Sequence, residues 1–400
     1  MEYHIRNSGF ELTIRKTGIF RASRGKFAMK GREFMVLEKL PVLKIGKYQP
    51  RFPIIQGGMG VMISGPNLCG AVAAAGGVGT LATVGLGMAA ASCGVANVMQ
   101  KNIEALKEFI ARARAHAKGG VIAANCMCAL TDYEKQIRAV CEAGVDIIIS
   151  GAGLPLKLPE LTKDFPDIAL VPIVSSLKAA DIIVRRWTRH FNRIPDAFVV
   201  ETPNAAGGHL GASSEEQAMD KKLSLETVIP ELVAWLKEKK LNIPVIAAGG
   251  IFDRKDMLHA FELGASGVQM GTRFAATVEG DASDGFKQAY VNAKEEDVVL
   301  LQSPCGLPGR AIKSPMLERY FSAVQKKLDP CIANCLSHCV YRNTHKTFCI
   351  AKALISAFQG NWENGLFFCG SNVGRVKKIQ RVKEIFDELM GTAEPENSKA

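Results

Sequence analysis

Residues 244–274, PVIAAGGIFDRKDMLHAFELGASGVQMGTRF, contain two short apolar runs on either side of a helix-like segment. The runs, 244–248 and 267–271, are too short for helices and lack the alternation of a half-exposed strand. The segment between them, 254–263, has helical spacing and ends at Gly264, a residue type that readily adopts the left-handed conformation after a helix. This order predicts a strand, a helix and a second, parallel strand.

The same alternation extends over most of the chain. We expect strands that are buried on both faces at 53–56, 78–83, 121–127, 146–150, 169–176, 197–201, 244–248 and 267–271. We expect helices at 97–116, 133–143, 177–189, 225–239 and 254–263. Eight such units predict an α/β fold, a TIM (β/α)8 barrel; a doubly wound open sheet is the alternative.

The amino-acid composition supports a folded, globular protein. The 400 residues are 48% hydrophobic and 22% charged, which suits a large core and excludes a disordered chain. The net charge of +11 is concentrated at the start, because residues 1–34 hold eight basic and three acidic side chains. We expect a basic, disordered arm at 1–34, a barrel at 35–320 and a mainly helical extension at 321–400. No basic cluster with interleaved aromatics appears in the barrel, so we expect no nucleic-acid partner.

Two further features concern the compartment. Residues 52–100 carry no charge, but glycines interrupt them throughout, so we expect a buried barrel wall and no membrane span. The first 34 residues lack the apolar core of a secretory signal. Eleven cysteines, an odd number, favour reduced thiols over a disulfide framework. We therefore expect a cytoplasmic protein.

The carboxyl ends of barrel strands are where ligands bind, and here they are rich in glycine. Gly249, Gly250 and Thr272 follow the seventh and eighth expected strands, where backbone N–H groups and a hydroxyl can cradle a phosphate. His209 follows Gly207-Gly208 after the sixth strand, and an imidazole there can exchange a proton near neutral pH. A lone histidine is often structural, so position alone leaves that alternative open.

In order, these motifs resemble the nitronate monooxygenase family, formerly called 2-nitropropane dioxygenases, which includes flavin-dependent enoyl-acyl-carrier-protein reductases. The resemblance runs from about residue 40 to about residue 315 and implies a TIM barrel that binds FMN non-covalently. It rests on QGGMG at 56–60, AAGGVG at 74–79, Asn125, AGGH at 206–209, AGGI at 248–251 and GTRF at 271–274.

The resemblance also implies roles for single residues. His209 matches the catalytic histidine of the family. The flavin-contacting positions are Gly58, Met59, Asn125, Gly207, Gly208, Gly249, Gly250, Gln269, Gly271 and Thr272. The chain departs from the common pattern at Thr202, where glycine is usual, and at Ala205, where an acidic residue is common. The substrate side of this loop is therefore atypical.

Two reactions fit the resemblance. The first is oxidation of alkyl nitronates with O₂ to a carbonyl compound and nitrite. The alternative is reduction of an enoyl thioester with NAD(P)H, with an acyl carrier protein as partner. In both, the substrate is a small molecule or its thioester, FMN carries the redox chemistry and His209 handles charge or a proton. A homodimer is the assembly we consider. A more distant alternative is a phosphate-binding barrel without redox activity.

The extension contains an unexpected cysteine pattern: Cys331, Cys335, Cys339 and Cys349 lie within nineteen residues. Such density in an intracellular enzyme suggests a metal site, for which a [4Fe–4S] cluster is our hypothesis and zinc an alternative. On one helix the first three would form a stripe about 12 Å long, too long for one cluster. Free thiols on a helical cap are therefore the other alternative. We also expect Arg310 to lie in a surface turn formed by residues 306–310.

Overall fold

The computed structural model describes residues 3–7, 10–14, 40–89, 98–322, 331, 334–344 and 346–393. The chain forms two compact units, Met1–Leu40 and Pro41–Ala400. In the first, the described residues form an antiparallel hairpin of β1 (Tyr3–Asn7) and β2 (Phe10–Ile14). The rest of the expected basic arm lies outside the described residues, and the three expected segments remain predictions.

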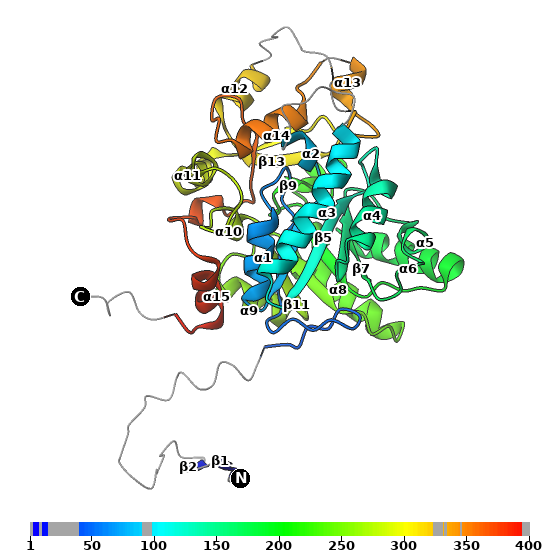
Figure 1. The fold of residues 1–400 in the computed structure, drawn as a ribbon, viewed down its shortest axis with the longest axis vertical. Coiled ribbons are helices and arrows are strands. Elements are labelled where there is room, and N and C mark those ends of the chain that lie inside the picture. Colours follow the sequence, from blue (N-terminus) through cyan, green and yellow to red (C-terminus); the bar gives the residue numbers. More distant parts are fainter. Residues whose placement is uncertain are drawn as a thin grey trace, which may run out of the picture. The chain divides into compact units, whose positions relative to one another are not determined.

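Eight parallel strands of the second unit close into a barrel (Figure 1), which confirms the predicted TIM fold. The order around the barrel is β10-β11-β3-β4-β5-β6-β7-β8. The ring closes because β11 pairs with β3 and β10 pairs with β8. The strands are β3 (Ile54–Gln56), β4 (Val78–Ala82), β5 (Val121–Met127), β6 (Ile147–Gly151), β7 (Ala169–Val174), β8 (Phe198–Glu201), β10 (Val245–Ala248) and β11 (Gly267–Met270).

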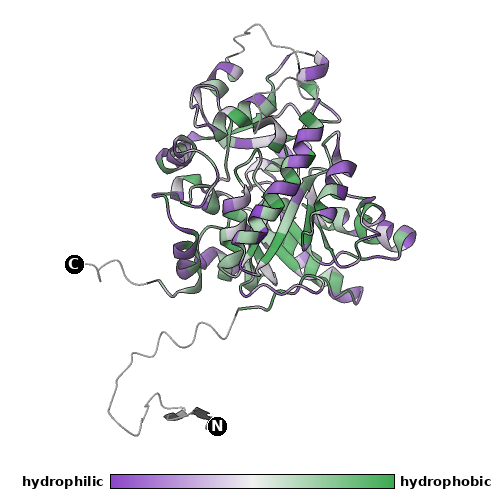
Figure 2. Ribbon diagram, viewed as in Figure 1, coloured by the Kyte–Doolittle hydropathy of each residue, from purple (hydrophilic) through white to green (hydrophobic). Residues whose placement is uncertain are grey.

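The barrel is filled by aliphatic side chains from every second residue of its strands. Ile147 and Ile149 of β6, Val199 of β8, and Ile246 and Ala248 of β10 belong to one buried cluster. Their outward-facing neighbours are buried too, under the surrounding helices, and the strands form the hydrophobic centre in Figure 2. Burial on both faces explains why the strands appear in the sequence as unbroken apolar runs.

Helices surround the barrel. Trp187 of α6 (Leu177–Phe191) illustrates how they pack: its ring is fully buried and its indole N–H donates to the Pro155 carbonyl at 3.1 Å. The longer helices are α1 (Pro66–Ala74), α3 (Val98–His116), α4 (Tyr133–Glu142), α6 (Leu177–Phe191), α8 (Leu225–Glu238), α9 (Arg254–Glu262) and α11 (Asp284–Asn292). Shorter ones are α2 (Leu86–Ala89), α5 (Leu158–Leu161), α7 (Glu215–Ala218) and α10 (Thr272–Ala275).

A small second sheet joins the barrel to the chain that follows it. Strand β13 (Pro308–Ile312) pairs antiparallel with β12 (Val298–Gln302), β14 (Phe367–Phe368) and β9 (Gly208–His209). β9 belongs to the loop after β8, so this loop is hydrogen-bonded to a strand a hundred residues later. Our prediction of a surface turn at 306–310 is wrong for Arg310, because every residue of β13 is buried.

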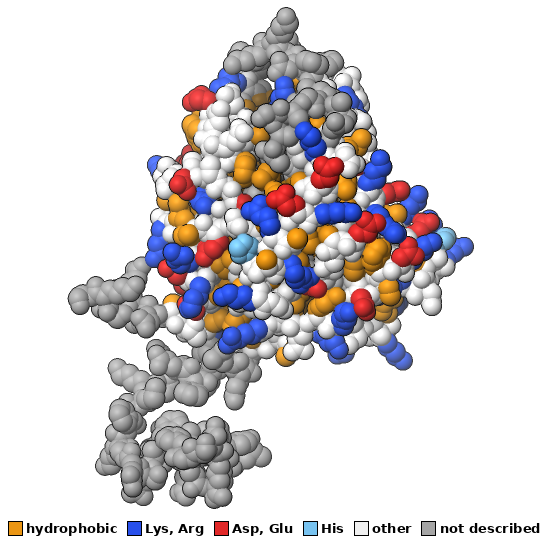
Figure 3. All heavy atoms as spheres, viewed as in Figure 1, with side chains coloured by type: hydrophobic (Ala, Val, Ile, Leu, Met, Phe, Trp, Pro, Cys, Tyr) orange, Lys and Arg blue, Asp and Glu red, His pale blue; other side chains and the backbone are white. Residues whose placement is uncertain are grey.

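The remaining chain is mainly helical. It contains α12 (Pro315–Phe321), α13 (Val340–Thr344) and α14 (Ile350–Phe358), which lie on one end of the barrel, and α15 (Val382–Met390), which packs on α1 and α9 (Figure 1). No helix among the described residues is long and apolar enough to cross a membrane. Basic and acidic side chains are interspersed on the face shown in Figure 3.

At the opposite end of the barrel from these helices, Asp146 joins three elements. Its carboxylate accepts hydrogen bonds from the Arg114 guanidinium at 2.9 and 3.0 Å and from the Ile122 backbone N–H at 2.8 Å. By contrast, Asp167 forms an exposed ion pair with Lys47, in which the aspartate side chain is 80% exposed. Charge-assisted hydrogen bonds in a half-buried setting are stronger than exposed pairs.

We expect Asp146→Asn to lower the free energy of unfolding by about 1.5–3 kcal/mol, because the amide cannot replace a bidentate carboxylate. Asp167→Asn is the matched control and is expected to leave the unfolding midpoint unchanged. Urea denaturation followed by circular dichroism measures both. Equal midpoints for the two variants would contradict this assignment.

Candidate active site

Three polar side chains stand at the carboxyl-terminal mouth of the barrel. Ala248, a member of the barrel core, is the register partner of Glu201 on one side and of Gln269 on the other. Asn125 is paired in the same way with the core residue Ile149. Paired residues of parallel strands point to the same face, so all three polar side chains point into the barrel. They form the layer above the aliphatic core.

Above this layer lies a cavity of about 570 Å³, within the range of cofactor and small-molecule sites. All eleven residues that the sequence analysis selected line it. They are Gly58, Met59, Asn125, Gly207, Gly208, His209, Gly249, Gly250, Gln269, Gly271 and Thr272. The structure thus brings together residues from five strand ends, those of β3, β5, β8, β10 and β11, while their individual roles remain predictions.

Glycine is required where the backbone approaches other groups closely. A Cβ atom at Gly58 would lie 2.3 Å from the Cβ of Asn125, so a side chain there would displace Asn125. At Gly249, where φ is +100°, a Cβ atom would lie 2.7 Å from the Thr202 hydroxyl. Both loops therefore present bare backbone to the cavity, which lets a flat ring or a phosphate come close.

Two amides at the mouth have hydrogen-bonding capacity to spare. The buried Oε1 of Gln269 has no hydrogen-bond partner among the described residues. The carboxamide of Asn125 is half-buried and also makes no hydrogen bond to a described residue. Buried polar groups are seldom left unpaired in a folded protein. A ligand with both donors and acceptors on its edge would satisfy them.

His209 is held on β9 by contacts from the second sheet. Its Nε2 lies 2.8 Å from the Ser303 hydroxyl, and its ring packs edge-on against Phe368 at 5.1 Å between centroids. Burial lowers the pKa of His209 to about 4, because the charged imidazolium is disfavoured away from water. The imidazole is therefore neutral at physiological pH and able to accept a proton.

Glu201 is a titratable group that the sequence analysis did not select. It lines the cavity, and no hydrogen bond or ion pair to its carboxyl is found among the described residues. Burial raises the pKa of Glu201 to about 7, so its carboxyl is far less acidic than usual. Its place at the end of a predicted strand, pointing inward, was the signal that could have identified it.

Arg310 fixes the loop that carries His209. Its guanidinium donates to the carbonyls of Pro203 and Asn204, each at 3.1 Å, and to that of Ala206. The side chain is 3% exposed and no carboxylate pairs with it among the described residues. Burial accordingly lowers the pKa of its guanidinium. The arginine satisfies three carbonyls of a loop that would otherwise leave them unpaired.

Sequence comparison agrees with this geometry. The family model described as nitronate monooxygenase matches residues 42–391. The chain belongs to the nitronate monooxygenase family. A probable nitronate monooxygenase of Staphylococcus saprophyticus is 36% identical over 123 residues, which are 30% of this chain and 33% of that protein. One from Staphylococcus aureus strain Newman is 33% identical over 153 residues, 36% of this chain and 41% of that protein. The chain thus aligns with between a third and two fifths of these curated relatives.

Solved structures show the family fold over a longer span. FabK from Thermotoga maritima is 26% identical, with a TM-score of 0.65, covering 86% of this chain and 93% of that one. A nitroalkane oxidase from Streptomyces ansochromogenes has the same TM-score at 17% identity, covering 86% of this chain and 96% of that one. The second likeness concerns the fold alone.

The four cysteines of the extension do not form the expected cluster. Within the described part of the chain, no group of three or more His, Cys, Asp or Glu side chains is arranged to hold a metal ion. Residues 334–339 do not form the helix that the spacing suggested, and α13 begins only at Val340. Cys331, Cys335, Cys339 and Cys349 pack instead with apolar side chains such as Leu336 and Ile350. The iron–sulfur and zinc hypotheses are therefore unsupported.

The hydrogen bonds from Arg310 to the loop after β8 can be tested by substitution. Arg310→Met keeps most of the side-chain volume but leaves three carbonyls unpaired, so we expect the free energy of unfolding to fall by about 2 kcal/mol or more. Arg185→Met, which removes an exposed pair with Asp181, is the control and should not move the urea midpoint. A wild-type midpoint for Arg310→Met would show that these hydrogen bonds are energetically neutral.

Proposed function

We propose that this protein is an FMN-dependent oxidoreductase that oxidises alkyl nitronates with O₂ to a carbonyl compound and nitrite. The observation that carries the proposal is the single cavity in which glycine-rich strand ends, unpaired amides and a neutral His209 meet. Family membership supports the same chemistry. A barrel without redox activity offers no explanation for this combination.

The residues present fit FMN. Gly58 and Met59 would lie against the flavin ring, and Asn125 and Gln269 would hydrogen-bond its polar edge, since both have free capacity. Gly207 and Gly208 would border the ring on the side of His209. Gly249, Gly250, Gly271 and Thr272 would hold the phosphate. When bound, FMN supplies the electron transfer and the reaction with O₂.

His209 would act on the substrate as a base. In the tautomer with its proton on Nε2, the ring donates to Ser303, and Nδ1 keeps a lone pair with no described partner. This lone pair would accept the α-proton of a neutral nitroalkane, whereas a preformed nitronate needs no such step. Ser303 would be a positioning residue, since it contacts the imidazole from outside the barrel.

The outer part of the cavity would hold the carbon chain of the substrate. It is lined by apolar side chains from the extension and from one barrel loop: Leu130, Leu336, Ile350, Leu354, Leu366 and Phe368. Residues 129–131 and 335–337 are joined here by backbone hydrogen bonds, which closes this wall. Apolar walls exclude water from the reacting atoms and favour alkyl over ionic substituents.

The same wall favours a second candidate function, NAD(P)H-dependent reduction of an enoyl thioester, whose acyl chain would lie along it. An acyl carrier protein would then be the partner, and His209 would polarise the thioester carbonyl. Family membership allows both reactions. For either reaction, we also propose a homodimer and a cytoplasmic location, as expected from the sequence. The ten described cysteines are all free thiols, which fits a reducing compartment.

One experiment separates the two reactions. The yellow holoenzyme is mixed anaerobically with ethylnitronate, NADH or NADPH, and bleaching of the flavin band is followed by stopped flow. We expect rapid bleaching with ethylnitronate and slow or no bleaching with nicotinamides. Bleaching by a nicotinamide alone would identify the reductase instead. A colourless protein that binds no added FMN would refute both.

A substitution of His209 tests its role as a base. We expect His209→Ala to retain FMN and to lose about 10²–10⁴-fold in kcat/KM for neutral nitroethane, with a smaller loss for ethylnitronate, which needs no base. His190→Ala, on the exposed face of α6, is the control. Equal losses on the two substrates would assign His209 a structural role.

The pH dependence follows from the same group. Because its pKa is lowered to about 4, His209 is neutral above that pH, and kcat/KM for nitroethane should fall as the pH drops through about 4. Any inflection near pH 7 belongs to Glu201, whose pKa is about 7, and should vanish in Glu201→Gln. A limb near pH 6.5 that disappears in His209→Ala would contradict the lowered pKa of this imidazole.

A further inference from the structure

A short segment far from the barrel motifs crosses the glycine loops of the cavity. The backbone N–H of Gly370 donates to the Thr272 hydroxyl oxygen at 2.8 Å. The N–H and the hydroxyl of Ser371 both donate to the Ala205 carbonyl, at 3.1 and 3.3 Å. Residues 369–372 are thereby fastened both to the loop after β11 and to the loop after β8.

The approach is too close for side chains. A Cβ atom at Gly207 would lie 2.4 Å from the carbonyl carbon of Cys369, and one at Gly370 would lie 3.1 Å from the Thr272 hydroxyl. Backbone therefore packs directly on backbone beside the proposed phosphate end. Asn372 lines the cavity here, and its carboxamide makes no hydrogen bond with any described residue. It is an unused donor at the place where an anion would lie.

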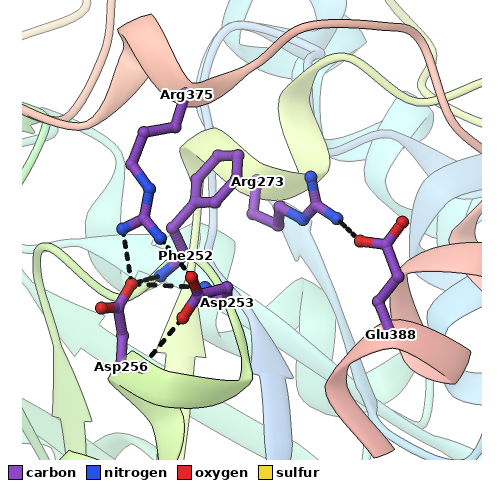
Figure 4. Close-up of polar contacts among 6 residues, drawn as sticks. All are labelled: Phe252, Asp253, Asp256, Arg273, Arg375 and Glu388. Atoms are coloured by element: carbon purple, nitrogen blue, oxygen red, sulfur yellow. Dashed lines mark hydrogen bonds and ion pairs between the residues drawn. The ribbon is translucent and has the colours of Figure 1, made fainter. Parts of the chain in front are cut away.

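The chain just after Asn372 is locked to the loop after β10 (Figure 4). The Arg375 guanidinium pairs with Asp256 at 2.6 Å and with Asp253, the two carboxylates that cap α9. It also stacks on the Phe252 ring at 4.7 Å from the centroid. Phe252 lies two residues after Gly250, so this contact reaches the glycine loop itself.

A second arginine extends the stack. The Arg273 guanidinium lies 4.5 Å from the centroid of the same Phe252 ring and pairs with Glu388 of α15 (Figure 4). The cluster thus holds two arginines and three carboxylates, with a formal charge of −1. Both guanidinium groups are neutralised by carboxylates, so the cluster positions the loops rather than supplying charge to a phosphate.

We propose that residues 369–372 form the outer wall of the cofactor's phosphate site, with the Asn372 carboxamide donating to a phosphate oxygen and Arg375 holding the wall in place. This inference rests on the proposed function, since it takes the ligand to be a flavin with a phosphate monoester. Asn372 is a binding residue in this scheme and Arg375 a positioning residue.

The test compares FMN with riboflavin, which lacks the phosphate, on the full chain stripped of flavin, by quenching of flavin fluorescence. We expect Asn372→Ala to raise the Kd of FMN about tenfold or more, the cost of a hydrogen bond to a charged group, and to leave the Kd of riboflavin unchanged. Arg319→Met, which removes the ion pair between α12 and Glu363, is the control for both ligands. The ³¹P resonance of bound FMN should shift in Asn372→Ala and not in Arg319→Met.

Arg375→Lys tests whether the contacts of Arg375 with Asp253, Asp256 and Phe252 hold residues 369–372 in place. Lysine keeps the charge but loses the two-carboxylate fork and the ring stacking, so we expect weaker FMN binding despite an unchanged net charge. Wild-type FMN binding and an unshifted ³¹P resonance in Asn372→Ala would refute the proposal that residues 369–372 border the phosphate site. Equal weakening of FMN and riboflavin would overturn the assignment of these residues to the phosphate, and wild-type FMN binding by Arg375→Lys would show that Arg375 does not hold them in place. A wild-type chain that binds neither flavin would refute the proposed function, a result distinct from these.

Discussion

The antiparallel pairing of β9 with β13 is the constraint on which the site depends. It places His209 opposite Gly309 and Gly208 opposite Arg310, so the loop after β8 is registered against a strand outside the barrel. Arg310 then occupies three carbonyls of the same loop. Burying an arginine without a carboxylate partner is costly, and here its donors satisfy backbone that no regular secondary structure could satisfy. The imidazole is thereby fixed relative to the barrel mouth.

Burial at this place sets the electrostatics of the mouth. It lowers the pKa of His209 to about 4 and raises that of Glu201 to about 7, so both groups are driven toward their neutral forms. An ionised carboxylate at the mouth would repel a nitronate anion or a flavin that gains negative charge. A neutral imidazole keeps the lone pair that a base requires. One physical cause, desolvation, accordingly shifts the pKa of an acid and the pKa of a base in opposite directions, and both shifts favour the neutral form.

The barrel could be predicted from the sequence because each of its units is encoded locally. All eight strands were located within one to two residues, since strands such as β5 and β8 are apolar runs bounded by glycines or helices. The residues that the family resemblance selected line the cavity because they lie at or just after strand ends, where position in the chain determines position in the fold. The contacts of Ser303, Arg310 and Gly370 could not be predicted, because each depends on pairing between segments separated by about a hundred residues. The cysteine spacing is the converse case: we interpreted a local pattern as a metal site, but no group of three or more His, Cys, Asp or Glu side chains in the described part of the chain is arranged to hold a metal ion.

A barrel rim alone is an open surface, and the extension turns it into an enclosed site. Strand β13 pairs with the strand that carries His209, α14 supplies an apolar wall, and residues 369–372 pack on the glycine loops. The pairing of β13 and the hydrogen bonds of Ser371 both hold the loop after β8, and the hydrogen bond of Gly370 to Thr272 holds the chain after β11. Loops at a barrel mouth are otherwise its most mobile elements, and reactions that need a flavin, a base and a substrate in fixed relation require them to be still. The small second sheet and the helices after it are thus parts of the active site, although none of them belongs to the barrel.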